Sequence, residues 1–109
     1  MKGARPLDRR EVRRALRACR DIRERSLMLL GLNLGLRVGE LLSLRWRDVW
    51  AGEKPVPLLY LTKAVTKGRR ARGVPMNAQA ARAVRTLRTW TRARGGSVDT
   101  EKALFPGRA

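Results

Sequence analysis

The chain has little of several residue types that carry catalytic or metal-binding chemistry. Its 109 residues include no histidine, one cysteine, one tyrosine and one phenylalanine. Without histidine there is no imidazole for acid–base catalysis or metal binding, and one cysteine cannot build a zinc site. The lone Cys19 cannot form an internal disulfide, which fits a reducing cytoplasm. We therefore expect no metal and no cofactor.

Long apolar runs are also missing. The leucine-rich run at residues 27–36 is too short to cross a bilayer, and residues 1–25 carry too many charges for a secretory signal. The length suits one small domain with a single core. We expect a single domain over residues 1–109 and no membrane partner.

Acidic residues are scarce. Nine Asp and Glu stand against 26 Lys and Arg, which gives a net charge of +17. Such a balance favours a polyanionic partner, most simply a nucleic acid, with an anionic membrane surface as the competing class.

The spacing of apolar residues predicts a mainly helical chain. Asp8 with Glu11 forms a capping box, Gly35 is a C-cap, and Asn77 is an N-cap. We expect helices over about residues 8–20, 24–34, 38–45 and 78–94. The second helix is apolar on nearly all sides, so we expect it to be central and buried.

Between about residues 48 and 76 the pattern changes to that of short strands. The β-prone run 58–62 precedes a basic turn around Gly68 and a return strand that ends at Pro75. A short strand at Val49 and Trp50 completes a small three-stranded antiparallel sheet. The expected fold class is α+β, with helices packed on this sheet. Tyr60 is interpreted as a packing residue within it.

Two charges, Arg37 and Glu40, interrupt the apolar run 26–46 at a spacing of three residues. On a helix this spacing makes them neighbours. A guanidinium in apolar surroundings costs free energy unless a partner or an anion compensates it. Two interpretations stay open from the residues alone: a purely structural buried ion pair, or a site for an anion.

The run Leu36-Arg-Val-Gly-Glu-Leu-Leu-Ser-Leu-Arg-Trp-Arg-Asp-Val49 resembles the first signature of the tyrosine recombinases, the phage integrase family. Residues 7–12 look like the opening of that family's catalytic domain. Residues 61–76 look like its β-hairpin, and residues 103–106 look like a segment midway through the domain. The resemblance covers nearly the whole chain, with the motifs in the family's order.

The family cleaves DNA with a tyrosine nucleophile, through a phosphotyrosyl intermediate. The resemblance implies that Arg37 is the first catalytic arginine and that Glu40 orients it. It implies that Lys67 is the general acid on the hairpin, or Lys63 if the hairpin register differs. The remaining hairpin arginines would contact DNA phosphates: Arg69, Arg70 and Arg72.

The family's remaining catalytic groups do not occur in these residues. There is no His-x-x-Arg box, and Tyr60 does not stand at the position of the nucleophile. We expect a truncated N-terminal half of the catalytic domain that binds DNA without cleaving it. The missing half would leave apolar surface exposed, so we expect self-association or pairing with a full-length recombinase. We expect it to act in the cytoplasm, at the nucleoid of a prokaryote or on phage DNA. Two alternatives are a non-catalytic nucleic-acid-binding regulator and a ribosome- or membrane-surface-associated basic protein.

Overall fold

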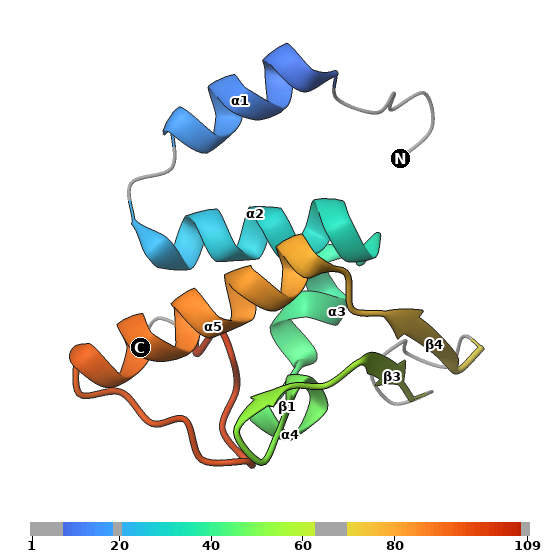
Figure 1. Cartoon of the computed structure of the whole chain (residues 1–109), viewed down its shortest axis with the longest axis vertical. Helices are drawn as coiled ribbons and strands as arrows, with labels where there is room; N and C mark the ends of the chain where they lie inside the picture. The colour runs from blue at the N-terminus through green and yellow to red at the C-terminus, as the bar shows by residue number, and fades with distance from the viewer. Residues whose placement is uncertain (1–7, 19–20, 63–69, 108–109) are drawn as a thin grey trace.

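The computed structural model of the chain describes residues 8–18, 21–62 and 70–107 (Figure 1). The elements within these residues are, in order, α1 (Arg9–Ala18), α2 (Ile22–Leu34), α3 (Val38–Ser43), α4 (Trp46–Val49), β1 (Trp50–Ala51), β2 (Lys54–Pro55), β3 (Leu58–Leu61), β4 (Arg72–Pro75) and α5 (Ala78–Ala93). The expected mainly helical α+β class is confirmed.

Side-chain caps begin the first two helices. The backbone N–H of Glu11 donates to Asp8 Oδ1 at 2.8 Å, and that of Asp8 donates to Glu11 Oε1 at 3.0 Å, so the expected capping box is present. Asp21 accepts from the backbone N–H of Glu24 at 2.9 Å and begins α2 at Ile22, two residues earlier than expected. A carboxylate at this position satisfies N–H groups that the helix itself leaves without partners.

Two further boundaries follow from single residues. Gly35 takes a left-handed conformation, with φ of 65°, and its N–H donates to the Gly31 carbonyl at the end of α2. Glycine tolerates this conformation because it has no Cβ. Asn77 accepts from the backbone N–H of Ala80 at 2.8 Å and begins α5. Both expected caps are confirmed.

The short helix α4 was not expected. Leu44 is extended, with ψ of 144°, so α3 ends at Ser43 and not near residue 45. The Asp48 carboxylate then accepts from the backbone N–H of Arg45 at 2.8 Å and starts a new turn at Trp46. Asp48 thus caps a helix of its own.

The sheet differs from the expected three-stranded one. β1 pairs with β2, and β3 pairs with β4, as two separate antiparallel ribbons. Gly52, at φ of 63°, turns the chain so tightly that β1 pairs with the residues just after it. β1 therefore pairs with β2 and not with β3. Pro57, which lacks an N–H, lies between the two ribbons.

The core lies between α2, α5 and the two ribbons. α5 contributes Ala80, Ala83, Val84 and Leu87, which are buried, and Trp90, which is half-buried. The tail also contributes Leu104 and Phe105, which are 2% exposed. The Leu104 N–H donates to the Leu44 carbonyl at 3.1 Å, which fixes this tail against the end of α3.

Two expectations about burial were wrong, the one for the second helix and the one for Tyr60. The second helix is not surrounded, because Leu32 on α2 is 45% exposed. α1 has no buried residue and lies on the outside of α2 (Figure 1). Tyr60 is 68% exposed, because side chains alternate along β3 and its neighbours Leu59 and Leu61 take the inward positions. No helix among residues 8–18, 21–62 and 70–107 is long and apolar enough to span a membrane.

The core position of Leu30 predicts a large effect of truncation. Leu30 is fully buried on α2, so Leu30→Ala should lower the free energy of unfolding by about 2–5 kcal/mol. Leu32→Ala, on the same helix but 45% exposed, should cost much less. Urea unfolding followed by circular dichroism measures both, and equal losses would contradict the assigned core.

Candidate functional site

Arg37 lies between α2 and α3, at the position just before the first turn of α3. Its backbone is extended, with φ of −78° and ψ of 156°. The side chain is exposed, although the surrounding sequence is apolar. Within the part of the chain that the structure describes, its guanidinium makes no hydrogen bond or ion pair. Arg37 therefore presents its donors to solvent.

Glu40 stands one turn later and is only 5% exposed. Its Oε1 accepts from the backbone N–H of Arg37 at 2.9 Å. The carboxylate also receives two bonds from Arg72: Nη2 donates to Oε1 at 3.1 Å and Nη1 to Oε2 at 3.2 Å. Glu40 thus contacts the backbone of Arg37, while its guanidinium partner is Arg72.

The ribbon of β3 and β4 brings Arg72 to this carboxylate. Arg72 is the first residue of β4 and pairs with Leu61, the last residue of β3. Leu61 is fully buried, so β3 is anchored in the core and carries β4 beside α3 (Figure 1). The Arg72 side chain remains 41% exposed. A bidentate pair with one buried member fixes the direction of the guanidinium.

The contacts of Glu40 favour its charged form. The backbone N–H of Arg37 and then the Arg72 guanidinium hold the pKa of Glu40 below its ordinary value of 4.5, although burial acts in the opposite direction. The Arg37 charge adds a smaller effect in the same sense as Arg72. The carboxylate therefore stays ionised at neutral pH.

The structure says less about the other residues singled out in the sequence. Arg70 is exposed, in the coil just before β4. Lys63, Lys67 and Arg69 lie outside the described residues. Sequence reasoning missed the bond between Arg72 and Glu40, which are 32 residues apart. No local period could have indicated it, because it depends on where the ribbon packs.

The arrangement suits an oxyanion. Arg37 and Arg72 place two guanidiniums near a single carboxylate, so the cluster keeps a net positive charge, and planar guanidinium donors match phosphate oxygens. The described residues hold no group of three or more Asp, Glu, His or Cys side chains that could bind a metal ion.

The pKa of Glu40 generates a pH prediction. A carboxyl whose pKa is lowered by folding stabilises the fold above its unfolded pKa, and this stabilisation is lost as pH falls through the folded pKa. Glu40→Gln should lower the free energy of unfolding by about 1–2 kcal/mol at neutral pH. The difference from wild type should shrink as pH falls from neutral to below the ordinary carboxyl value of 4.5. Urea unfolding of both proteins across this pH range measures the difference.

Glu101→Gln is the matched control. Glu101 pairs with Arg45 and Arg47 at 3.2 and 3.0 Å, but its side chain is 61% exposed. Exposed pairs contribute little, so this change should be nearly neutral. Equal effects of the two substitutions would contradict the special role of Glu40.

Comparison with known proteins identifies the family. The model of the Phage integrase family matches residues 5–109. The chain is 41% identical over 88 residues to tyrosine recombinase XerC of Xanthomonas campestris pv. campestris (strain B100), covering 81% of this chain and 24% of that protein. It is 38% identical over 88 residues to tyrosine recombinase XerC of Xanthomonas axonopodis pv. citri (strain 306), covering 81% of this chain and 25% of that protein. No solved structure matches the chain significantly.

The chain spans about a quarter of the length of these relatives. The order of its motifs and the match along residues 5–109 agree with the resemblance of the run around Arg37. The chain belongs to the phage integrase family, the tyrosine recombinases.

Proposed function

We propose that this chain is a DNA-binding part of a site-specific recombinase and corresponds to the N-terminal half of its catalytic domain. The observation that carries the proposal is the exposed guanidinium of Arg37 beside the Glu40–Arg72 pair. The family match and the net charge of +17 support it, because a duplex is a dense array of phosphates. The same proposal puts its site of action in the cytoplasm, on chromosomal or phage DNA.

In this proposal Glu40 holds Arg37 and Arg72 in place in different ways. Arg37 is the first phosphate ligand, and its guanidinium is free to reach a non-bridging oxygen. Glu40 positions Arg37 through the backbone N–H, at 2.9 Å, and holds Arg72 through the side chain. Arg72 offers its remaining donors to the same or a neighbouring phosphate. Fixed cations of this kind stabilise the charge that develops during phosphoryl transfer.

The hairpin supplies the remaining contacts. Lys67, or Lys63 in the alternative register, would protonate the departing oxygen in a complete enzyme, as the family resemblance implies. Arg69 and Arg70 would hold the DNA backbone without reading its sequence. These assignments rest on the resemblance and on the connection between β3 and β4 that carries all four residues.

The chain alone should bind DNA and not cut it. Its residues include no histidine, and Tyr60 lies on the exposed face of β3, before the hairpin connection. Catalytic groups act as a unit, so a partial set retains little activity.

Self-association stays a prediction. Leu32, Val38 and Leu42 are large apolar side chains with 45–62% exposure on α2 and α3. Sedimentation of the free chain measures whether copies of the chain associate. Pairing with a full-length recombinase through the same surface would be seen as a mixed species in the same experiment.

Removing Arg37 and Lys67, the two catalytic cations that the family resemblance implies, should weaken DNA binding. Arg37→Ala with Lys67→Ala should lower the affinity for a mixed-sequence duplex and reduce the salt slope by about 2, because each phosphate contact releases about one counterion. Fluorescence anisotropy at several salt concentrations measures both quantities. Arg47→Ala with Lys54→Ala removes the same charge away from the site and should change them less. Equal losses would reduce the proposal to general electrostatic attraction.

A nicked suicide duplex tests the absence of cleavage. Such a substrate traps the covalent protein–DNA intermediate of tyrosine recombinases, because the cleaved end diffuses away. We expect no adduct on a denaturing gel, since the chain lacks most of the catalytic set. A covalent adduct formed by this chain alone, and lost in Tyr60→Phe, would contradict the assignment.

A further inference from the structure

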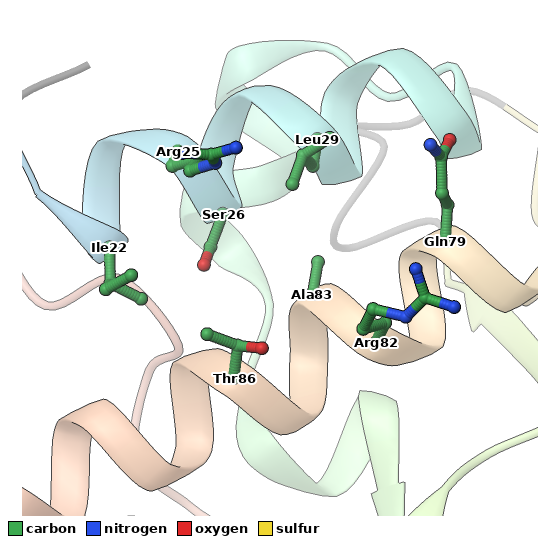
Figure 2. A pocket seen from close by; sticks show the side chains of 8 residues that line it. All are labelled: Ile22, Arg25, Ser26, Leu29, Gln79, Arg82, Ala83 and Thr86. Atoms are coloured by element: carbon green, nitrogen blue, oxygen red, sulfur yellow. The ribbon is translucent and has the colours of Figure 1, made fainter. Parts of the chain in front are cut away.

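The helices α2 and α5 border a groove of about 280 Å³ (Figure 2). We call it the α2–α5 groove. Figure 2 shows Arg25 on the α2 wall and Arg82 on the α5 wall, with the Ser26 hydroxyl and the Ala83 methyl group directed between the two helices. Arg25 and Arg82 are exposed, whereas Ser26 and Ala83 are buried. The groove therefore has a charged rim and a buried floor.

The floor of the groove is mostly apolar. Ile22 and Leu29 line it from α2 and are only partly buried, while Ala83 lines it from α5. Partly buried aliphatic side chains contribute to binding when another apolar group covers them and removes them from water. The floor therefore suits an aliphatic side chain of a ligand.

A hydroxyl group lies on the same floor. Ser26 is only 3% exposed, and its Oγ makes no hydrogen bond among the residues that the structure describes. Most buried polar side chains in proteins have a hydrogen-bond partner. The Ser43 hydroxyl of α3, for comparison, donates to the Gly39 carbonyl at 2.8 Å. The Ser26 hydroxyl can therefore donate to an acceptor that enters the groove.

The rim arginines differ from their neighbours on the same helices. Three other arginines lie over aromatic rings: Arg23, Arg88 and Arg94 over Phe105, Trp50 and Trp90, at 5.8, 4.5 and 4.8 Å from the ring centroids. Within residues 8–18, 21–62 and 70–107, Arg25 and Arg82 make no such contact and no ion pair. No residue that lines the groove is acidic. Two guanidiniums are therefore available to an anionic ligand at the rim.

These features favour a protein segment over a nucleic-acid backbone. Phosphate and sugar oxygens would bind the rim arginines, but they offer no aliphatic group to cover Ile22 and Leu29. Charge alone does not decide, because phosphates and carboxylates both pair with arginine. A peptide supplies carboxylates, aliphatic side chains and backbone carbonyls together. Peptides of this kind bind hydrophobic grooves through apolar anchor residues.

A second copy of this chain has few carboxylates to offer. Of its nine acidic residues, Asp8, Asp21 and Asp48 accept backbone N–H bonds where helices begin, and Glu40 and Glu101 pair with arginines. Two copies also repel each other, because each has a net charge of +17. An acidic segment that fits the groove therefore belongs to a different protein.

We propose that the α2–α5 groove is a docking site for an acidic segment of another protein, in which an aliphatic side chain is flanked by carboxylates. The aliphatic side chain covers the floor, the carboxylates bind the two rim arginines, and a carbonyl oxygen of the segment accepts from the Ser26 hydroxyl. Arg37, Glu40 and Arg72 do not line the groove. The docking site therefore uses other side chains than the proposed phosphate site and stands independently of it.

Two labelled peptides test the proposal. The probe is fluorescein-labelled Gly-Glu-Asp-Leu-Glu-Asp-Gly, and the control peptide has serine in place of leucine at the same net charge. Anisotropy titrations with the whole chain at about 0.15 M salt measure both affinities, because screening limits general attraction at this ionic strength. The leucine peptide should bind about tenfold more tightly, since its aliphatic side chain is removed from water.

Substitutions in the groove should weaken this binding. Arg25→Gln with Arg82→Gln should lower the affinity for the leucine peptide about tenfold, because two charge-assisted contacts are lost. Ser26→Ala should lower it about threefold through the lost hydrogen bond. Arg14→Gln with Arg92→Gln removes equal charge at exposed positions outside the groove and should bind nearly as wild type does. Circular dichroism checks that each variant is folded.

A mixed-sequence duplex separates docking from DNA binding. The groove substitutions should lower the duplex affinity no more than the control substitutions do, and Ser26→Ala should not change it. A larger loss for the duplex than for the leucine peptide would assign the groove to nucleic acid and overturn the inference. Equal affinities of wild type for the two peptides, an unchanged peptide affinity in Ser26→Ala, equal losses in the control variant, or no peptide binding by wild type would overturn it as well. A failure of wild type to bind the duplex would contradict only the proposed function.

Discussion

The Glu40 carboxylate joins parts of the chain that are far apart in sequence, and the candidate site depends on it. One oxygen fixes the backbone entering α3, and both receive the Arg72 guanidinium from β4. The cost of burying a carboxylate is met only because both partners are present. Without this group, Leu61 would still anchor β3 in the core, but the Arg72 guanidinium of β4 would lose its carboxylate partner.

This contact changes the meaning of the two charges in the apolar run. The spacing of Arg37 and Glu40 made them neighbours on a helix, and a direct pair between their side chains was one of two open interpretations. The structure gives Glu40 a different guanidinium and leaves that of Arg37 open to solvent. A carboxylate that neutralised Arg37 would compete with a phosphate for the same donors. Holding Arg37 by its backbone keeps those donors available.

Local chemistry made much of the fold predictable, and packing accounts for the rest. Asp8, Gly35 and Asn77 were recognisable caps because a cap depends on the adjacent residues. The separate ribbons were missed because the pairing of β1 depends on the tight turn at Gly52. Arg37 and Glu40 were candidates because they interrupt an apolar run and match the family signature, but the partner of Glu40 was not predicted, because a contact across 32 residues leaves no periodic signal.

The stacked arginines have a consequence for a chain with so few acids. With nine carboxyl groups for 26 cations, many guanidiniums cannot find an anionic partner within the protein. Three of these guanidiniums instead stack on the aromatic rings of Trp50, Trp90 and Phe105. A ring does not titrate. These three attachments therefore persist in acid, where a carboxylate would be protonated and would release its arginine.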